Sequence, residues 1–442
     1  MTCDQPAIAG SWLVRRLFPV LATAGLLIVG MASTIWWGPA LVGKTGWSLP
    51  HDLWGTMIAA QRLARGDLAG LYTFPTGLVS LPGAAVIMVP VVLVAEAAGL
   101  SLRVPGPHHA HPGAWLLAGP YAIVLAATAL FAADALAEYL GVSRPRRAVL
   151  AGAGAVGVWS VSARWGHPED AVAVALLLSG VLALARDRAG RAAWLTGAAI
   201  AVQPLVVLAV PVLLAVLPVR RWPAFLARAA APGAVVLAAA AAADWSATAR
   251  AVLRQPNWPA VDHPTPWTPL APALAHHAVA AGPVRWLAVL AACGCGLAVR
   301  RARGAPGQHR PEGAAPDRSA DGAPERAGWW TAEELRGLLW WLAVALALRS
   351  VFEPVMVAYY PWPALALALI AATASWRRLI TTSVAAAAVT GLAQGQWRGL
   401  WTWWAPVIAL LVVTLVLARP RRRPEARGTG PEERPREMMI AS

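Results

Sequence analysis

Ionisable side chains are sparse in this sequence, and those that lie beside apolar runs form three groups. A carboxylate that is held at the right distance and partly desolvated can take a proton from a hydroxyl group. Arginine offers a forked, permanently charged donor that suits phosphate oxygens. Together, these residue types suit proton transfer at a hydroxyl group beside a bound phosphate. The three groups are His51-Asp52, then His167 with Glu169 and Asp170, and finally Arg349, Glu353 and the pair Tyr359-Tyr360.

Each group also has a structural explanation. Near a membrane surface such residues can be solvated loop groups, and Asp170 could cap a helix that begins at Ala171. The run His108-His109 with His111 has no further ligand nearby, so solvation explains it better than a metal site, and we predict none. A fourth, weaker group consists of Asn257, Trp258, Asp262 and His263.

The composition indicates a membrane protein. Of the 442 residues, 58% are hydrophobic and only 13% are charged, against about 25% charged in a soluble domain. Many apolar runs approach the length of about 20 residues that a helix needs to cross the hydrocarbon core. We therefore expect an all-α, polytopic membrane protein with about ten to twelve transmembrane or re-entrant helices.

The basic residues predict how these helices are oriented. The formal net charge of +15 would suggest nucleic-acid binding on a soluble surface. Here the arginines cluster at the ends of apolar runs, and loops of this kind stay on the cytoplasmic side. We therefore expect no nucleic-acid partner and both termini in the cytoplasm. Abundant alanine and the near-total use of arginine over lysine favour a GC-rich bacterial genome, so we expect the membrane to be a bacterial plasma membrane.

The same pattern divides the chain into four parts. An amino-terminal transmembrane body, 1–299, carries outside loops at 38–77 and 244–283. Residues 300–335 are rich in Arg, Gly, Pro, Glu and Ala, which predicts a flexible cytoplasmic linker. A carboxy-terminal four-helix transmembrane part, 336–418, and a disordered cytoplasmic tail, 419–442, follow. This topology places all three groups of ionisable residues on the outside face.

Two apolar segments conflict with a simple series of crossings. The stretch 192–217 lies between two arginine-rich loops, but two crossings would need about 40 residues. Proline removes a backbone donor and bends a helix, so we expect a V of two half-membrane helices with Gln203-Pro204 near its tip. A single kinked crossing is the alternative. The segment 79–100, which contains Pro82, Pro90 and Glu96, is compatible with a crossing or with a re-entrant or broken helix.

Several motifs that mark other enzyme classes are absent from the sequence. We find no GxxxxGK[ST] phosphate loop, no GxGxxG after a strand, no HExxH and no GxSxG. These absences argue against an ATP-driven pump, a dehydrogenase, a zincin and a serine hydrolase.

The order of the remaining motifs resembles the GT-C glycosyltransferases that use polyprenyl-phosphate sugars. Three stretches carry the likeness: His51-Asp52-Leu53 through Gly66-Asp67 to Leu71-Tyr72, then Gly166 to Asp170 with the later Gln203-Pro204, and finally Arg349 to Tyr360. The closest likeness is to the bacterial glycosyltransferase family 87, the alpha-mannosyltransferase-like membrane proteins. It covers about residues 10–375, and its motifs are loose. That family has Lys-Pro where this sequence has Gln203-Pro204, so the position carries no charge here.

The resemblance implies a GT-C-like fold and a transferase reaction at the outside face. A mannose-like pentose or hexose would move from a polyprenyl-phosphate carrier to a lipid, glycan or protein acceptor, with Asp52 as the general base. The carrier already has a phosphate leaving group, so no cofactor is required and a divalent cation is not indicated. Substrate-binding roles would fall to His51, His167, Glu169, Asp170, Gln203, Arg349, Glu353, Tyr359 and Tyr360.

Two other functions are compatible with the sequence. Broken helices at mid-membrane are also typical of transporters and flippases for lipids or small solutes. However, the two halves show no inverted repeat, and the acidic residues lie at span ends. The other alternative is a non-catalytic membrane protein that keeps a GT-C-like fold.

Overall fold

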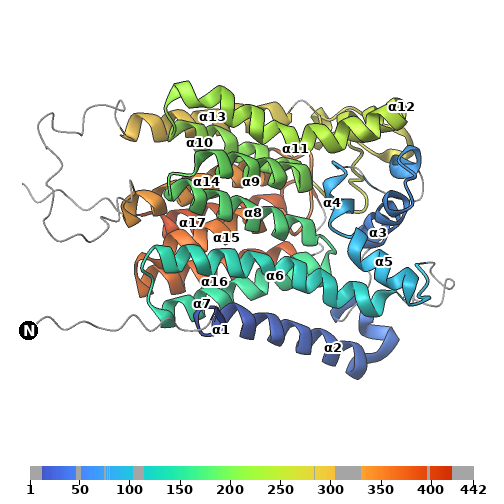
Figure 1. Cartoon of the computed structure of the whole chain (residues 1–442), viewed down its shortest axis with the longest axis horizontal. Coiled ribbons are helices and arrows are strands. Elements are labelled where there is room, and N and C mark those ends of the chain that lie inside the picture. Colours follow the sequence, from blue (N-terminus) through green and yellow to red (C-terminus); the bar gives the residue numbers. More distant parts are fainter. Residues whose placement is uncertain are drawn as a thin grey trace, which may run out of the picture.

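The protein is a predominantly helical bundle whose long helices run roughly parallel to one axis (Figure 1). The computed structural model describes residues 12–45, 51–73, 76, 78, 80–102, 114–282, 284–303, 330–395 and 399–420, without the side chains of 33–45 and 51. The tail beyond 420, most of the predicted linker, the histidine run at 108–111 and the His51 side chain lie outside the described residues.

The helices before the linker are α1 (Trp12–Arg15), α2 (Leu17–Thr45), α3 (His51–Ala64), α4 (Gly83–Val86), α5 (Val89–Ala97), α6 (Trp115–Tyr139), α7 (Arg144–Trp159), α8 (Pro168–Ala185), α9 (Ala189–Val202), α10 (Val210–Ala215), α11 (Trp222–Ala243), α12 (Trp245–Ala249) and α13 (Val284–Arg303). Those after it are α14 (Ala332–Phe352), α15 (Trp362–Ala371), α16 (Trp376–Ala393) and α17 (Trp404–Ala418). The short strands β1 (His263–Pro264) and β2 (Val355–Met356) pair antiparallel.

Four helices in the described parts of the chain are long and apolar enough to cross a membrane: Trp115–Tyr139, Pro168–Ala185, Val219–Ala243 and Ala332–Phe352. Shorter apolar helices accompany them at Leu17–Ala32, Pro204–Ala215, Trp362–Ala374 and Trp404–Ala418. The fold is therefore that of an all-α membrane protein, as the composition predicts. The finer expectation of about ten to twelve crossings stays a prediction.

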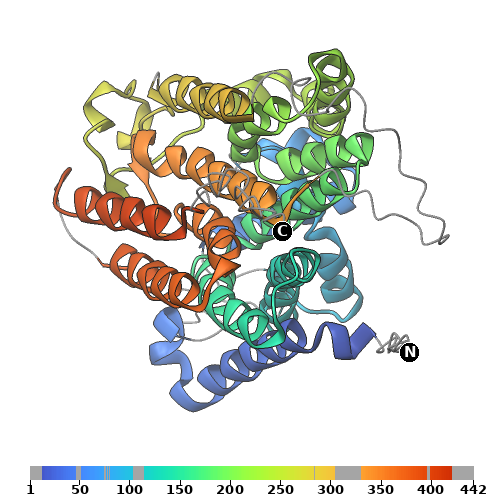
Figure 2. The same cartoon turned by 90° about the vertical axis from the view of Figure 1, so that its left-hand side faces the viewer.

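Charge is distributed unevenly between the two ends of the bundle. Most span-end arginines meet at one end, which we call the arginine-rich end and which faces the viewer in Figure 2. There Arg146 donates to the carbonyl oxygen of Thr373, Arg336 donates to Leu140, and Arg300 lies over the ring of Trp222. Exposed tryptophans lie near both ends, as in the aromatic belts of membrane proteins: Trp12, Trp194 and Trp376 near the arginine-rich end, and Trp245, Trp286 and Trp401 near the other.

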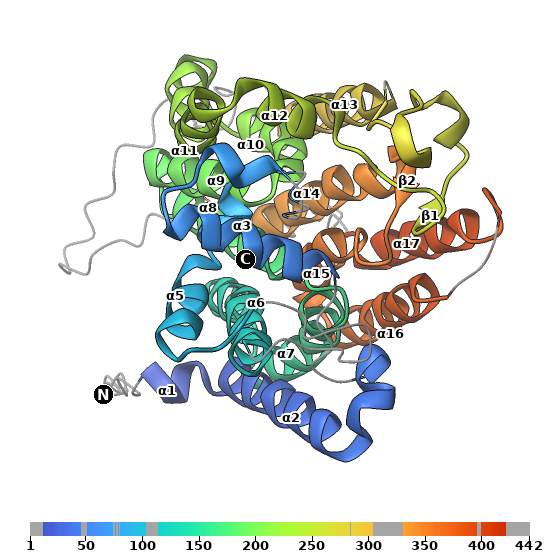
Figure 3. The same ribbon diagram turned by 90° about the vertical axis from the view of Figure 1, so that its right-hand side faces the viewer.

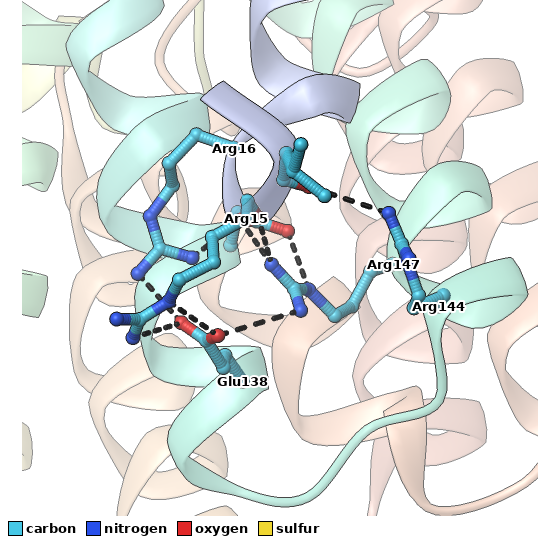
Figure 4. A network of polar contacts seen from close by, with 7 residues as sticks. Arg15, Arg16, Glu138, Arg144 and Arg147 are labelled. Atoms are coloured by element: carbon cyan, nitrogen blue, oxygen red, sulfur yellow. Dashed lines mark hydrogen bonds and ion pairs between the residues drawn. The ribbon is translucent and has the colours of Figure 1, made fainter. Parts of the chain in front are cut away.

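A buried ion-pair network fastens the first helices to the bundle at the arginine-rich end (Figure 4). Arg147 on α7 donates to both carboxylate oxygens of Asp134 on α6, at 2.7 and 2.6 Å, and Arg16 reaches the same carboxylate at 2.8 Å. The partly exposed Glu138 pairs with Arg15 and Arg16. Because Asp134 is 2% exposed, its negative charge depends on these arginines.

The stretch 192–217 turns back to the side from which it came. Helix α9 ends at Val202, Gln203 has extended backbone angles, and the segment Pro204–Ala209 with α10 leads away again. Asp187 before α9 and Arg221 after α10 form an ion pair at 3.5 Å, so both limbs start and end at the arginine-rich end. The chain therefore forms the V that the charge conflict predicts, with Gln203-Pro204 at its tip.

The segment 79–100 is also broken. It forms the short helices α4 and α5, which pack against α3 and lie together at the end opposite the arginine-rich end (Figures 1 and 3). Gly83 on α4 lies directly against the backbone at Ala201, close to the tip of the V. A side chain at Gly83 would clash there, which explains why this approach needs glycine. Helix α4 and the tip of the V therefore pack closely against each other.

The helices on both sides of the predicted linker share one core with the rest of the bundle. Helix α14 packs on α13 and α15, and α16 packs on α7. The linker is shorter than its predicted bounds, because α13 continues to Arg303 and α14 begins at Ala332. Thr331 and Glu334 form a capping box at the start of α14. The two linker ends meet where Arg303 lies over the ring of Trp330.

Replacing Asp134 by Ala tests the buried network. The variant leaves Arg147 buried without a full partner, so we expect a loss of about 3 kcal/mol or more in unfolding free energy. Denaturation of the purified protein in detergent measures this loss. Glu138→Gln is the matched control because Glu138 is partly exposed, and we expect it to cost less than about 1 kcal/mol. Equal effects of the two variants would contradict a buried ion pair.

Candidate functional site

The three predicted groups of ionisable residues lie together at the end of the bundle opposite the arginine-rich end (Figure 3). The start of α3 supplies Asp52, and the turn between α7 and α8 supplies His167, Glu169 and Asp170. The tip of the V supplies Gln203. The end of α14 and the loop after it supply the remaining side chains: Arg349, Glu353, Tyr359 and Tyr360.

His167 links two carboxylates. Its Nε2 atom lies 3.1 Å from Oδ2 of Asp52, and its Nδ1 atom lies 2.6 Å from Oε1 of Glu169. The Asp52 side chain is 58% exposed, whereas those of His167 and Glu169 are 14% and 8% exposed. Asp52 is therefore the member of this triad that a molecule from solution can reach.

The local backbone explains how His167 is held. Helix α7 ends in a π-helical turn, Ser160–Arg164, and Gly166 follows with a φ of +72° that favours glycine. Trp165 donates from its indole nitrogen to Gln394 at 2.9 Å. The ring of His167 stacks on Tyr359 with centroids 4.1 Å apart. These contacts leave the imidazole little freedom to rotate.

Asp170 does not cap α8. The helix begins at Pro168, its cap residue is His167, and no side chain caps it. Instead, the Asp170 carboxylate accepts a hydrogen bond from the Gln203 amide at 2.6 Å. The uncharged Gln203 thus binds Asp170 as a donor without neutralising it.

Arg349 has the most unusual environment in the site. Its side chain is 6% exposed, and its guanidinium lies 3.4 Å above the ring of Tyr360. The nearest carboxylate oxygen is Oδ1 of Asp170, which is 3.9 Å from Nη1 and therefore beyond hydrogen-bond distance. Its Nε atom is buried with no partner. Among the described residues, this guanidinium makes no hydrogen bond, which is costly for a buried cation.

A cavity of about 170 Å³ adjoins Arg349. Its polar wall includes Gln203 at the tip of the V and Glu353 beside Arg349. The remaining wall is largely apolar and comes from the V, α13 and α14: Pro204, Leu205, Val207, Leu208, Ala288, Val289 and Phe352. The cavity therefore suits a ligand with a small anionic group and an apolar body.

Glu353 is paired with Arg285, a residue that the sequence analysis missed. Nε of Arg285 lies 3.0 and 3.1 Å from the two carboxylate oxygens, and Gln255 accepts a further hydrogen bond from the same guanidinium. Both Arg285 and Gln255 line the cavity. Arg285 is the second residue of α13, at the end of the bundle opposite the arginine-rich end. An arginine at that end of a span is an exception to the charge rule, and this exception was the available signal for Arg285.

Of the weaker fourth group, Asp262 interacts with residues of the site. His263 lies on β1 and directly follows Asp262 in the sequence. Its ring stacks on Trp403 with centroids 3.7 Å apart. Burial, and then the negative charge of Asp52, raise the pKa of Asp262 to about 6 against the opposing charge of His167. Thr265 anchors this loop by donating to the carbonyl oxygen of Glu353 at 2.7 Å.

The charge state of His167 follows from its two partners. Burial opposes protonation, but the charge of Glu169 and the hydrogen bonds to Asp52 and Glu169 outweigh it and raise the pKa of His167 to about 10. At neutral pH, a protonated His167 donates to both carboxylates and fixes the orientation of Asp52. In the described parts of the chain, no three His, Cys, Asp or Glu side chains are grouped to hold a metal ion.

No protein-family model matches the chain, and a search of curated proteins finds none that is similar to it. The functional argument therefore depends on the geometry of the site alone.

The pH dependence of stability tests the charge of His167. Its folded-state pKa of about 10 lies above the ordinary value of 6.5. The stabilisation is therefore complete below pH 6.5 and is lost as the pH rises through about 10. We expect the difference in Tm between wild type and His167→Gln to shrink over this range.

Thermal unfolding in detergent at a series of pH values measures this difference. The control is His276→Gln, which changes an exposed loop histidine outside the site. A difference for His167→Gln that stays constant across the range would contradict a protonated His167.

Proposed function

We propose that the protein is a membrane glycosyltransferase of the GT-C type that takes its sugar from a polyprenyl-phosphate carrier. The observation that carries this proposal is the buried guanidinium of Arg349, which faces a largely apolar cavity and makes no hydrogen bond among the described residues. A guanidinium in such surroundings gains most from an anion that offers several acceptor oxygens, as a phosphate does.

The apolar wall of the cavity supports a lipid carrier. The polyprenyl chain would lie along the limb of the V and α13, where Leu205, Leu208 and Val289 line the cavity. Its phosphate would then reach Arg349 and the amide of Gln203. Broken backbone at membrane depth is tolerated where protein or a cavity surrounds it. The V thus provides both the wall of the cavity and a place for the chain.

The acceptor would approach from the opposite side of the site, where Asp52 is exposed. A continuous series of contacts joins Asp52 to Arg349: His167 stacks on Tyr359, Tyr359 contacts Tyr360 edge-on at 5.1 Å, and Tyr360 lies under the guanidinium. This connected series of side chains at one end of the bundle supports placing the phosphate and the acceptor in one site, as transfer between them would require.

The reaction can be written with the residues at hand. The acceptor hydroxyl oxygen forms a bond to the anomeric carbon of the sugar, and the bond from that carbon to the phosphate oxygen breaks. Asp52 takes the hydroxyl proton, with protonated His167 holding its carboxylate in place. Polyprenyl phosphate leaves with the bonding electrons, and Arg349 stabilises the growing negative charge. No step calls for a cofactor.

The orientation in the membrane follows from the charges. The arginine-rich end would face the cytoplasm and the site would face the outside. There the protein would meet polyprenyl-phosphate sugars and a lipid, glycan or protein acceptor of the cell envelope. The sugar would be a mannose-like pentose or hexose.

A transporter or flippase for a lipid or small solute is the second candidate. The observation that favours it is the broken V, whose tip lies at the cavity, because transporters build substrate sites from interrupted helices. Against it, the proton-accepting triad is open to solution at Asp52 and is not enclosed at mid-membrane.

Substitution of Asp52 by Asn distinguishes these candidates. With the protein in liposomes and a labelled polyprenyl-phosphate mannose as donor, we expect wild-type transfer to an added lipid or glycan acceptor. Loss of a general base costs about 100-fold or more in rate, so the variant should transfer far more slowly. Asp67→Asn, a change in the loop beyond α3, is the matched control and should keep full activity.

Two results would contradict the proposal. Transfer by Asp52→Asn at the wild-type rate would remove Asp52 from the mechanism. Uptake of the labelled lipid or solute into sealed vesicles without any glycosylated product would favour the transporter.

A further inference from the structure

The ion pair between Arg285 and Glu353 affects more than the local charge balance. We propose that Arg285 is a positioning residue that holds the Glu353 carboxylate away from Arg349 and so keeps the Arg349 guanidinium available to an anionic ligand in the cavity. The inference rests on the proposed function for the identity of that ligand, a lipid phosphate. In this proposal, Glu353 is the ion-pair partner of Arg285 and does not contact the substrate.

The geometry of the pair shows how firmly Glu353 is held. The carboxylate accepts hydrogen bonds from Nε of Arg285 at 3.0 and 3.1 Å and a further one from Nη2. The Glu353 side chain is 1% exposed, so bulk water has little access to these bonds. Two oxygens shared by one planar guanidinium make a strong and directional pair.

Arg349 is the alternative partner for this carboxylate. Arg349 lies in the last turn of α14, and Glu353 is the residue that caps the end of this helix. Both line the same cavity, and both lie close to Tyr360. A buried carboxylate without a partner is strongly disfavoured, so Glu353 would turn to Arg349 if Arg285 were lost.

Arg285 is itself held from the other side of the cavity. Its Nη1 atom donates to the side-chain oxygen of Gln255, which follows the π-helical turn Arg250–Arg254. Gln255 has a φ of +36°, a backbone conformation that residues other than glycine seldom adopt. The neighbouring Asn257 and Val279 exchange two backbone hydrogen bonds, of 2.9 and 2.8 Å, that fix this loop. The surrounding structure thus imposes the conformation that aims Gln255 at Arg285.

The two arginines of the cavity therefore have different tasks. Arg285 is committed to Glu353 and Gln255, whereas Arg349 has Asp170 only at 3.9 Å and no hydrogen bond among the described residues. An incoming phosphate would meet one uncommitted guanidinium beside one neutralised carboxylate. Without Arg285, the same phosphate would compete with Glu353 for Arg349.

Because Arg285 acts through Glu353, a second substitution at Glu353 should rescue the loss of Arg285. We expect Arg285→Gln to weaken binding of geranylgeranyl phosphate by about tenfold or more, because Glu353 then occupies Arg349. Arg285→Gln combined with Glu353→Gln removes the competing charge and should restore binding to within about threefold of wild type. Glu353→Gln alone should bind at least as tightly as wild type.

Binding is measured by the change in tryptophan fluorescence of the full chain in nanodiscs as geranylgeranyl phosphate is added. Each variant is first checked for a single symmetric peak in size-exclusion chromatography. Arg65→Gln is the matched control: it breaks the exposed ion pair with Glu96, away from the cavity, and should bind like wild type. If Arg285→Gln and the double variant are equally weak, Arg285 contacts the ligand itself and the proposal is overturned. Unchanged binding by Arg285→Gln overturns it as well.

A ligand-free structure of Arg285→Gln by electron microscopy separates this inference from the proposed function. We expect the Glu353 carboxylate within hydrogen-bond distance of Arg349. A carboxylate that stays in its wild-type position overturns the positioning role, whatever the ligand. Failure of the wild-type protein to bind geranylgeranyl phosphate, with Glu353 moved in the variant structure, would instead count against the lipid-phosphate function alone.

Discussion

The structure of the site is governed by the cost of placing charges where water cannot reach them. At this end of the bundle Glu169, Asp170, Arg349 and Glu353 are all less than a tenth exposed. A buried charge is retained only when another group compensates it. Glu169 has His167, and Glu353 has Arg285. Asp170 accepts a hydrogen bond from the neutral Gln203. Arg349 is the exception in making no hydrogen bond among the described residues, since an aromatic face and a distant carboxylate compensate it only in part.

The break in the helix at Gln203 lies beside the cavity that Arg349 adjoins. Gln203 and the segment Pro204–Ala209, where the helix is broken, form one wall of the cavity beside α13 and α14. The break also releases backbone groups that need partners, which restricts it to the protein interior. Asp170 and α4 both contact the tip, so the same features that stabilise the V also form the wall of the site.

Sequence reasoning locates much of this arrangement, for physical reasons that can be named. The charge rule assigns whole loops to one end, so it brings Asp52, His167 and Arg349 to the same face without any knowledge of contacts. The V follows from length, because two arginine-rich loops flank too few residues for two crossings. The start of α14 was also available in the sequence, since Thr331 and Glu334 have the spacing of a capping box.

The pairings within the site could not be predicted in the same way. Each acidic group has several cations at its own end of the bundle, and the choice of Arg285 for Glu353 depends on how α13 packs against α14. The left-handed backbone at Gln255 has no signature in the sequence, because glutamine rarely adopts it. Which groups form an ion pair depends on how the helices pack, whereas the end of the bundle at which a residue lies can be predicted from the sequence.

The most direct test of the account is a structure of the wild-type protein determined with a polyprenyl phosphate bound. We expect phosphate oxygens at a hydrogen-bond distance of about 3 Å from the Arg349 guanidinium. The polyprenyl chain should lie against Leu205, Leu208 and Val289, with Glu353 still paired with Arg285. A phosphate bound elsewhere, with the Arg349 guanidinium closed onto Asp170, would contradict the account.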